Sequence, residues 1–291
     1  MVKIKIHTID AYQFIFELLE PATKEELIQF FHLSKKAQKK YHFPNQKTYQ
    51  KKERIALSFP IEAFESKKMN EIELIYEDEM ILIVNKPPFL LVHCDGQEED
   101  TLQDRVNAYL KQSYWPHKAQ ALHRIDYETS GLVLFCKNPF FQACFDAMIA
   151  CHQIKKQYLC VVEGRFPDHK KIINQKISRN RHNAKAMIIH PKGKDAYTEI
   201  TCLKKAKNRS LLKAEIKTGR KHQIRLHCSS IAYPIVNDAL YGHISDSRGL
   251  LLQAQCLEFI HPINQTKLKI QLEMDRRFTK EFDNKYDNQN T

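Results

Sequence analysis

The chain contains little glycine, and none of it lies near the start. Only seven of the 291 residues are glycine, and the first is Gly96, so the first third must turn without the residue that most readily adopts positive φ. Long apolar runs are also missing. No stretch is long enough to span a bilayer, and the N-terminus lacks the apolar core of a signal peptide. We therefore expect a cytoplasmic protein with no membrane partner.

Paired cysteine motifs are absent as well. The eight cysteines form no C-x-x-C pair, and several fall inside apolar runs, which is typical of small buried hydrophobes in a reducing compartment. We expect neither disulfides nor a zinc site, and no metal or cofactor. The cysteines are Cys94, Cys136, Cys144, Cys151, Cys160, Cys202, Cys228 and Cys256.

Positive charge, in contrast, is abundant. Lys and Arg outnumber Asp and Glu by 46 to 34, which gives a formal charge of +12 and a pI near 9.2. Such a surplus favours polyanionic partners such as nucleic acid, although an acidic membrane surface would also attract it. With 43% hydrophobic residues, the chain is long enough for one large domain and a small one.

Residues 1–70 have the pattern of a small N-terminal α/β unit. Thr23 and Glu26 form a capping-box motif that predicts the start of a helix. The run Lys35–Lys40 is dense in lysine, and it fits either a solvated helix face or an RNA contact. Arg54–Phe59 alternates between polar and apolar residues, as a strand does.

Strand and helix patterns alternate beyond residue 70. Residues 72–84 predict two strands joined by an acidic turn, the second of which ends at Pro87 and Pro88. Thr101 precedes an amphipathic helix, and apolar residues recur at helical spacing over 140–154. Strands resume at Tyr197.

Two segments have weaker patterns. Residues 165–195 are polar and basic, and we expect a loop that either faces RNA or only connects strands. Residues beyond about 278 are polar, so we expect a frayed tail over 279–291.

The stretch His123–Lys137 presents one carboxylate, Asp126, directly before a short apolar run typical of a buried strand. Arg124 is near enough to keep this carboxylate ionised, since an unperturbed Asp has a pKa of about 3.9. Asp126 is therefore a candidate nucleophile or general base. A surface ion pair at the entrance of a strand fits the same residues, and a hydrolase would need Glu77 or Asp78 to converge on Asp126.

A second unusual stretch, Thr218–His227, combines three cations and two histidines. The spacing of His222 and His227 suits neither a helix face nor a strand face, which disfavours a metal site. Gly219 followed by two cations fits a phosphate site. Arg225 lies in an apolar setting and needs an anionic partner.

Asp126 is the obvious partner for Arg225. A third feature is the strand pattern over residues 155–164, where alternation puts Tyr158 on the opposite face from Leu159. Tyr158 could therefore line a cleft.

Taken together, these motifs resemble those of the RluA-type pseudouridine synthases. The stretch HRIDYETSGLVLFCK is similar to that family's HRLDxxTSGLLLxAK signature, and TGRKHQIRLH is similar to its TGRxHQIRxH. Both motifs occur in the family's order, and the similarity covers roughly residues 72–275. The N-terminal unit only faintly resembles an S4-type RNA-binding domain.

The resemblance implies an α+β fold in which helices flank a mixed, largely antiparallel sheet with a central active-site cleft, over residues 71–278. It also implies isomerisation of uridine in structured RNA, ribosomal or transfer, to pseudouridine, without metal or cofactor. We expect a monomer. The alternative is an RNA-binding or RNA-chaperone protein that keeps the fold with weak or no catalysis.

The resemblance also implies residue roles. Asp126 matches the nucleophile, Tyr158 the ring that stacks on the uracil, Arg225 the partner of the carboxylate, and Arg124 the side chain that fills the gap left by the flipped base. Whether attack falls on C1′ or C6, or passes through a glycal, stays open. Further RNA contacts are expected from Lys86, His123, Thr129, Arg220, Lys221, His222 and Gln223.

Three positions depart from the family pattern. Phe89 and Asn237 replace glycines that are usual after Lys-Pro-Pro and before Asp238, and Gln253 stands where histidine is common. None of them removes a catalytic group, so we expect changes in loop geometry or substrate fit.

Overall fold

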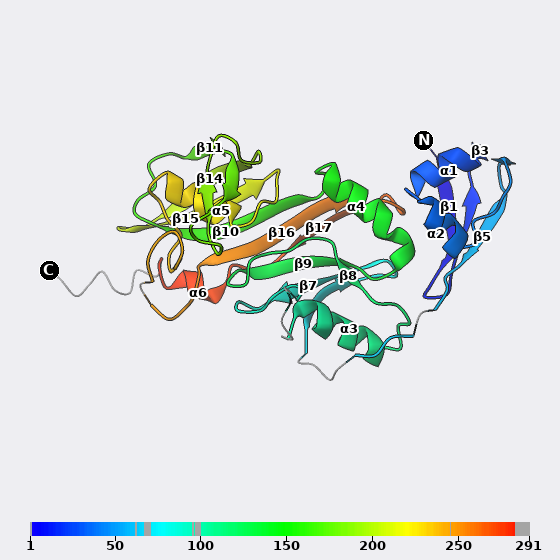
Figure 1. Ribbon diagram of the computed structural model, residues 1–291, viewed down its shortest axis with the longest axis horizontal. Coiled ribbons are helices and arrows are strands. Elements are labelled where there is room, and N and C mark those ends of the chain that lie inside the picture. Colours follow the sequence, from blue (N-terminus) through cyan, green and yellow to red (C-terminus); the bar gives the residue numbers. More distant parts are fainter. Residues whose placement is uncertain are drawn as a thin grey trace.

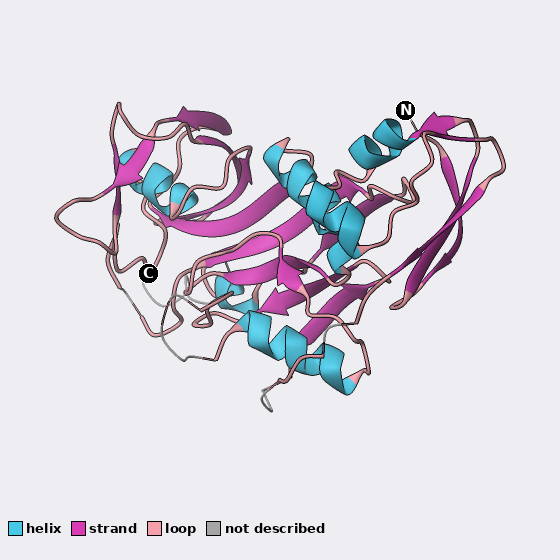
Figure 2. Cartoon of the chain, turned by 45° about the vertical axis from the view of Figure 1, so that its right-hand side comes forward, coloured by secondary structure: helices cyan, strands magenta, loops and turns pink. Residues whose placement is uncertain are grey.

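The computed structural model describes residues 2–61, 63–66, 71–94, 96, 100–244 and 246–282. A long ten-stranded sheet forms the body of the molecule, and a three-stranded sheet from the N-terminal unit lies at one end of it (Figure 1). Most helices lie against the faces of the large sheet (Figure 2). The expected boundary near residue 70 falls at residues 67–70, outside the described part of the chain.

The N-terminal unit contains both elements that its sequence predicts. The helix α1 begins with the complete capping box of Thr23 and Glu26, and the alternating run forms an edge strand paired with β2. Its elements are β1 (Ile4–Ile9), β2 (Gln13–Leu18), β3 (Ala22–Thr23), α1 (Lys24–Phe30), α2 (Lys35–Lys40), β4 (Thr48–Tyr49) and β5 (Arg54–Ser58).

Turns in this glycine-free part rely on other residues with positive φ. His32, His42 and Lys52 have φ values of 53°, 49° and 66°. Left-handed backbone costs a non-glycine residue free energy, which neighbouring packing must offset.

The N-terminal unit shares a hydrophobic core with the body of the protein. The contact is the short 3₁₀ helix Pro139–Phe141, whose Phe140 ring lies 5.4 Å from the rings of Phe31 and Phe59 and 5.0 Å from Tyr41. These rings are buried. The pair with Tyr41 is edge-on and the other two are tilted. An edge-on aromatic pair adds about 0.5–1.5 kcal/mol beyond its buried area, so this contact helps to hold the unit in place.

The large sheet is antiparallel except at one joint. Its strand order is β11-β14-β15-β10-β16-β9-β7-β6, with β17 paired to β16 and β8 to β9, and among the described strands only β16 and β9 run parallel. Its strands are β6 (Glu73–Glu77), β7 (Ile81–Lys86), β8 (Gln120–Ala121), β9 (Ser130–Cys136), β10 (Lys155–Glu163), β11 (Lys170–Asn174), β14 (Tyr197–Lys205), β15 (Arg209–Ile216), β16 (Leu252–Ile260) and β17 (Lys267–Gln271).

Gly131 permits the parallel joint between β9 and β16. Its φ is +118°, and a Cβ built there would lie 2.2 Å from the carbonyl oxygen of Ala254 on β16. Only glycine allows such an approach without moving the strands. The glycine of the His123–Lys137 stretch therefore joins the two antiparallel halves of the sheet, directly after the loop that carries Asp126.

Four helices accompany this sheet, and the predicted ones are present. Thr101 caps α3, and α4 follows the 3₁₀ helix within the segment 140–154, where helical spacing is observed. The helices are α3 (Leu102–Gln112), α4 (Gln142–Ala150), α5 (Gln223–Ser230) and α6 (Arg276–Thr279).

Two expectations about irregular segments are wrong. Residues 165–195 are not a loop, because they contain β11 and the hairpin of β12 (Ile177–Arg179) with β13 (Met187–Ile189). The polar sequence hides apolar anchors such as the buried Ile173 and Ile177. The tail is not frayed from 279 onward, because Phe282 is buried. Residues 283–291 lie outside the described part.

Within the described residues, no helix is long and apolar enough to cross a membrane.

Candidate active site

Asp126 lies on the loop that enters β9, at the edge of a cavity of about 740 Å³. The N–H of Thr129 donates to the Asp126 carbonyl at 3.1 Å and closes a turn before the strand. Every residue of β9 is buried, so the strand fixes the position of the loop. The loop from β8, the hairpin β12–β13, the start of β10 and the start of α5 complete the walls.

The cavity is strongly cationic. Among the described residues that line it, Asp126 is the only carboxylate. A groove with this charge pattern attracts a polyanion and surrounds a single reactive anion. Its cationic side chains are Arg124, Lys156, Arg179, Arg220, Lys221 and Arg225.

Arg225 is 1% exposed and anchors the charged groups around Asp126. Its Nη1 lies 3.6 Å from the Asp126 carboxylate, so the predicted ion pair exists. Its main partner is different, however. Nε and Nη2 donate to the two oxygens of buried Asp238 at 2.8 and 2.9 Å, and Nη1 donates to Glu128 at 3.2 Å. Asp238 holds the guanidinium, which in turn faces Asp126.

Burial raises the pKa of Asp126 above its ordinary value, against the opposing effects of Arg225 and Arg124. Its side chain is 17% exposed. A carboxylate that is poorly solvated yet faces two cations is a better nucleophile than one fully hydrated in water. The sequence interpretation of an exposed ion pair at a strand entrance therefore does not describe this site.

Tyr158 lies on β10 with its ring among buried apolar side chains, and its remaining surface lines the cavity. The prediction that it lines a cleft is confirmed. Burial, and then the nearby charge of Asp126, raise the pKa of its hydroxyl. The Tyr158 hydroxyl therefore stays protonated and uncharged, and it lies near the Asp126 carboxylate.

Two of the three histidines that line the cavity, His123 and His222, are held neutral by burial. His222 starts α5 with φ 55°, and its Nε2 lies 4.0 Å from Asp126 while Nδ1 contacts the Tyr241 hydroxyl at 2.9 Å. Burial lowers its pKa to about 4. Burial also lowers the pKa of His123 to about 3, and its Nε2 accepts the backbone N–H of Leu134 at 3.2 Å. Neither ring supplies a positive charge at neutral pH.

Two residues predicted to contact RNA, Lys86 and Gln223, are buried in structural roles, although Gln223 also lines the cavity. Lys86 is 0% exposed, and its Nζ donates to the carbonyls of Pro87, Leu90 and Tyr127 at 2.8, 2.8 and 3.1 Å. Burial lowers the pKa of this ammonium to about 7. It supports the Asp126 loop from behind instead of contacting RNA.

Gln223 is the other of these buried residues. Its amide bonds Thr218, the Arg220 N–H and the Tyr197 carbonyl at 2.8, 3.1 and 2.9 Å, and it is 3% exposed. The hydrogen bonds of Gln223 therefore fix the turn that carries Arg220 and Lys221. The Arg220 N–H is committed to this bond and is not available to a phosphate.

The other predicted contacts line the cavity. Arg124 and Lys221 are exposed, and Arg220 is half-buried with its Nε donating to the Asp195 carbonyl at 2.9 Å. Thr129 is 1% exposed, and its hydroxyl has no hydrogen-bond partner among the described residues.

Sequence reasoning assigned no role to three residues of this site and considered a fourth, Arg179, only as part of a loop that could face RNA. Asp238 and Glu128 hold Arg225, while Lys156 and Arg179 add charge to the cavity wall. Glu128 falls inside a quoted motif and Asp238 directly follows the departure at Asn237, so a search for the anion that a buried Arg requires would have found them. Arg179 lies in the segment that was expected to be a loop.

The departures at Phe89 and Asn237 preserve the backbone that glycine would adopt. Their φ values are 60° and 63°. The Asn237 amide donates to Asp246 at 2.9 Å and to the Gly249 carbonyl at 3.1 Å, which offsets part of the strain. Phe89 packs its ring edge-on against Tyr127, with centroids 5.9 Å apart.

Gln253 also has a structural role. Its amide donates to the Glu273 carbonyl at 3.0 Å and accepts the Asp275 N–H at 3.1 Å, which ties β16 to the segment after β17. The three departures leave the residues around Asp126 in place.

A second carboxylate does not converge on Asp126 from the acidic turn. Asp78 accepts the N–H groups of Met80 and Ile81 at 2.8 and 2.9 Å, and Glu77 pairs with Lys137 at 2.6 Å. The acidic turn is the tip of the β6–β7 hairpin, so the hydrolase interpretation lacks its second group. Across the described residues, no group of three or more His, Cys, Asp or Glu side chains could hold a metal ion.

Comparisons with known proteins agree with this geometry. Residues 80–230 match the family model of RNA pseudouridylate synthases. An uncharacterized RNA pseudouridine synthase of Bacillus subtilis is 33% identical, over 66% of this chain and 65% of that protein. The ribosomal large subunit pseudouridine synthase D of Zymomonas mobilis is 34% identical, over 70% of this chain and 69% of that protein.

The fold has solved counterparts. The human RNA pseudouridylate synthase domain containing 1 superposes with a TM-score of 0.61 at 22% identity, over 72% of this chain and 86% of the human one. The predicted α+β architecture is thereby confirmed. The quoted motifs lie within or beside the matched segment, and we conclude that this chain belongs to the RluA-type family of RNA pseudouridylate synthases, enzymes that isomerise uridine in RNA.

Proposed function

We propose that this chain converts uridines in structured RNA, ribosomal or transfer, to pseudouridine, with Asp126 as the nucleophile. The observation that carries the proposal is a single carboxylate at the edge of a cavity lined by cations, 3.6 Å from a buried guanidinium. The names of relatives such as the Zymomonas mobilis protein put the ribosomal large subunit first among the candidate substrates.

The cavity supplies what the isomerisation requires. The N1–C1′ bond must break, the uracil must turn, a C5–C1′ bond must form, and the proton on C5 must leave while N1 gains one. Asp126 would supply the electron pair that stabilises the separated sugar or base. Arg225 keeps this carboxylate aimed, because Asp238 fixes the guanidinium from the other side.

Tyr158 and Arg124 would handle the flipped nucleotide. Extruding a uridine from a stem costs a few kcal/mol, and one aromatic stack on the base returns about 1–3 kcal/mol. The Tyr158 ring lines the cavity that holds Asp126, so a stacked uracil would lie beside the carboxylate. Arg124 is exposed at the mouth, where it could fill the vacated position in the RNA.

The test is a map of pseudouridine in cellular RNA treated with the protein, read as carbodiimide-dependent stops of reverse transcription. We expect new stops at particular uridines with the wild type and none with Asp126→Ala. Separate ribosomal and transfer RNA fractions identify the substrate class. Identical maps from the two proteins would contradict the proposal and favour the RNA-binding alternative.

A further inference from the structure

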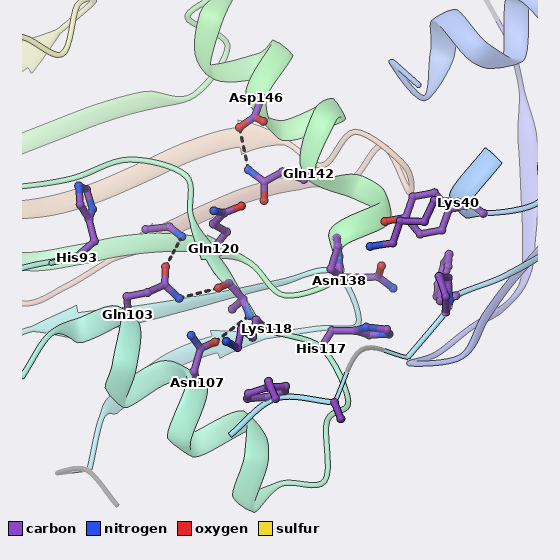
Figure 3. Close-up of a pocket in the computed structure, with 18 residues that line it drawn as sticks. Lys40, His93, Gln103, Asn107, His117, Lys118, Gln120, Asn138, Gln142 and Asp146 are labelled. Carbon is purple, nitrogen blue, oxygen red and sulfur yellow. Dashed lines mark hydrogen bonds between the residues drawn. The ribbon is translucent and has the colours of Figure 1, made fainter. Parts of the chain in front are cut away.

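A second cavity, larger than the one beside Asp126, lies between the N-terminal unit and the body of the protein. Its volume is about 900 Å³, within the range of ligand pockets. Tyr41 and Phe59 come from the N-terminal unit, while α3, the segment around β8 and the start of α4 form the other walls. Figure 3 shows side chains from these elements converging on the space. We call it the interdomain groove.

The interdomain groove continues toward the active site along two shared walls. On α4, Gln142 and Asp146 line the groove, while Ile149 and Ala150, both about one turn beyond Asp146, line the active-site cavity. Residues 119–121 line the groove, and residues 122–126 line the active-site cavity. A chain-like ligand held at Asp126 could therefore extend into the groove.

The walls of the groove combine polar and apolar side chains and carry little negative charge. Asp146 is the only carboxylate among the described residues that line it, and Lys40 and Lys118 contribute positive charge. Gln103 is committed to the backbone, since it donates to Ala119 at 2.6 Å and accepts from Ala121 at 3.0 Å. The groove is thus rigid on the α3 side.

Other amides remain available. Gln120 is exposed, and its side-chain amide makes no hydrogen bond to any described residue, although its backbone pairs with β9; the Oε1 of Gln142 likewise accepts none. In Figure 3, Gln120 lies between Gln142 on α4 and Gln103 on α3. Amide side chains both donate and accept, which suits the edges of unpaired bases, while lysines suit phosphates.

We propose that the interdomain groove binds unpaired nucleotides of the same RNA whose target uridine lies at Asp126. The inference rests on the proposed function, because the substrate of the active site supplies the chain that enters the groove. Single-stranded RNA fits the observations better than a peptide, because the groove joins a cationic cavity and presents amides and lysines at its walls.

The length of RNA that would reach the groove follows from the protein segment that joins the groove to Asp126. Seven residues, 120–126, lead from the groove to Asp126, and a fully extended segment of this length spans at most about 25 Å. About seven stacked nucleotides cover the same distance at roughly 3.4 Å each. A single-stranded tail of about eight nucleotides on a stem-loop would therefore reach the groove.

The test measures binding and does not require isomerisation. The probes are three fluorescein-labelled stem-loops with a uridine-rich loop: one without a tail, one with a 5′ tail and one with a 3′ tail, each tail of about eight unpaired nucleotides. The variant is the double substitution Lys40→Gln and Lys118→Gln. The control is Lys269→Gln, an exposed lysine on β17 that lines neither cavity.

We expect one tailed probe to bind the wild type about tenfold more tightly than the probe without a tail, and the double variant to lose this gain. The slope of log K against log salt for the tailed probe should fall by about 1.4, since each phosphate contact to a single strand contributes about 0.7. Lys269→Gln should bind all three probes as the wild type does.

Equal affinity for all probes, or a gain that survives in the double variant, would overturn the groove as an RNA site. Because the pseudouridine map is a separate measurement, a groove that fails this test leaves the proposed activity standing. If the protein shows no activity but still binds the tailed probe more tightly, only the proposed activity is contradicted, and the groove stands as an RNA site.

Discussion

The active-site cavity and the interdomain groove are both cationic, yet they are held open in opposite ways. The active-site wall is fixed by buried ions, with Arg225 gripped by Asp238. The groove is fixed by neutral amide bonds from Gln103 and by aromatic packing, and its exposed Lys118 borders solvent.

The difference follows from what each site does. A reactive carboxylate must be poorly solvated and accurately placed, so the active site keeps charges inside at a desolvation cost. Binding a flexible polyanion needs only solvated charge near its phosphates, which costs little. Neutral hydrogen bonds are therefore sufficient to hold the walls of the groove.

The largest expected effect is a loss of stability that differs between the wall of the active-site cavity and the wall of the interdomain groove. Asp238→Asn keeps the side-chain shape but removes the charge that holds Arg225, and breaking a buried ion pair costs about 3–5 kcal/mol of unfolding free energy. Gln103→Met leaves two backbone groups of the groove without their amide partners, and we expect a loss of about 1–2 kcal/mol. Urea unfolding of both variants measures the contrast.

The matched control for Asp238 is Glu128→Gln. Glu128 is 29% exposed and contacts the same guanidinium at 3.2 Å, so its neutralisation should cost less than about 1 kcal/mol. Equal losses for Asp238→Asn and Gln103→Met would show that buried charge does not distinguish the active-site wall.

A smaller effect tests whether the Tyr158 ring stacks on the flipped uracil. Tyr158→Leu removes the stacking ring but keeps an apolar side chain, so the protein should fold while the isomerisation rate at subsaturating RNA falls about 10- to 100-fold. Tyr158→Phe keeps the ring and should stay within about threefold of the wild type. Single-turnover kinetics provide the measurement. If Tyr158→Phe is as slow as Tyr158→Leu, the Tyr158 hydroxyl, and not stacking of its ring, is needed for the isomerisation.

The smallest effect is on the pH profile. Burial raises the pKa of Asp126 above 3.8, and the nucleophile must be ionised, so activity should fall as pH drops through this raised value. Because the pKa of Asp126 is higher in the folded state than in the unfolded chain, ionisation of Asp126 lowers the free energy of unfolding as pH rises. The Tm of Asp126→Asn should therefore equal or exceed that of the wild type at neutral pH.

Arg124 opposes the raised pKa of Asp126. Arg124→Gln should therefore move the acid limb of the single-turnover rate to higher pH, while Lys269→Gln should leave it unchanged. The rates are measured at saturating RNA, so that weaker binding does not enter. An acid limb that stays in place would show that solvent screens the Arg124 charge.

Local patterns predicted most of the elements because they depend on neighbours in sequence. The capping box at Thr23, the N-cap at Thr101, the β6–β7 hairpin and the buried strand β9 all follow from residues within a few positions. The expectation of a loop over 165–195 fails because the strands there are short and their exposed faces are polar. Only their pairing, β11 with β14 and β12 with β13, reveals them.

By itself, the sequence determined the family, the sheet-rich architecture and the candidacy of Asp126, Tyr158 and Arg225, because these depend on motifs and periodicity. Only the tertiary structure decided which partner each charge has. It gave Asp238 to Arg225, buried Lys86 beneath the Asp126 loop and opened the interdomain groove beside α4. Contacts between residues distant in sequence depend on packing, which no local pattern encodes.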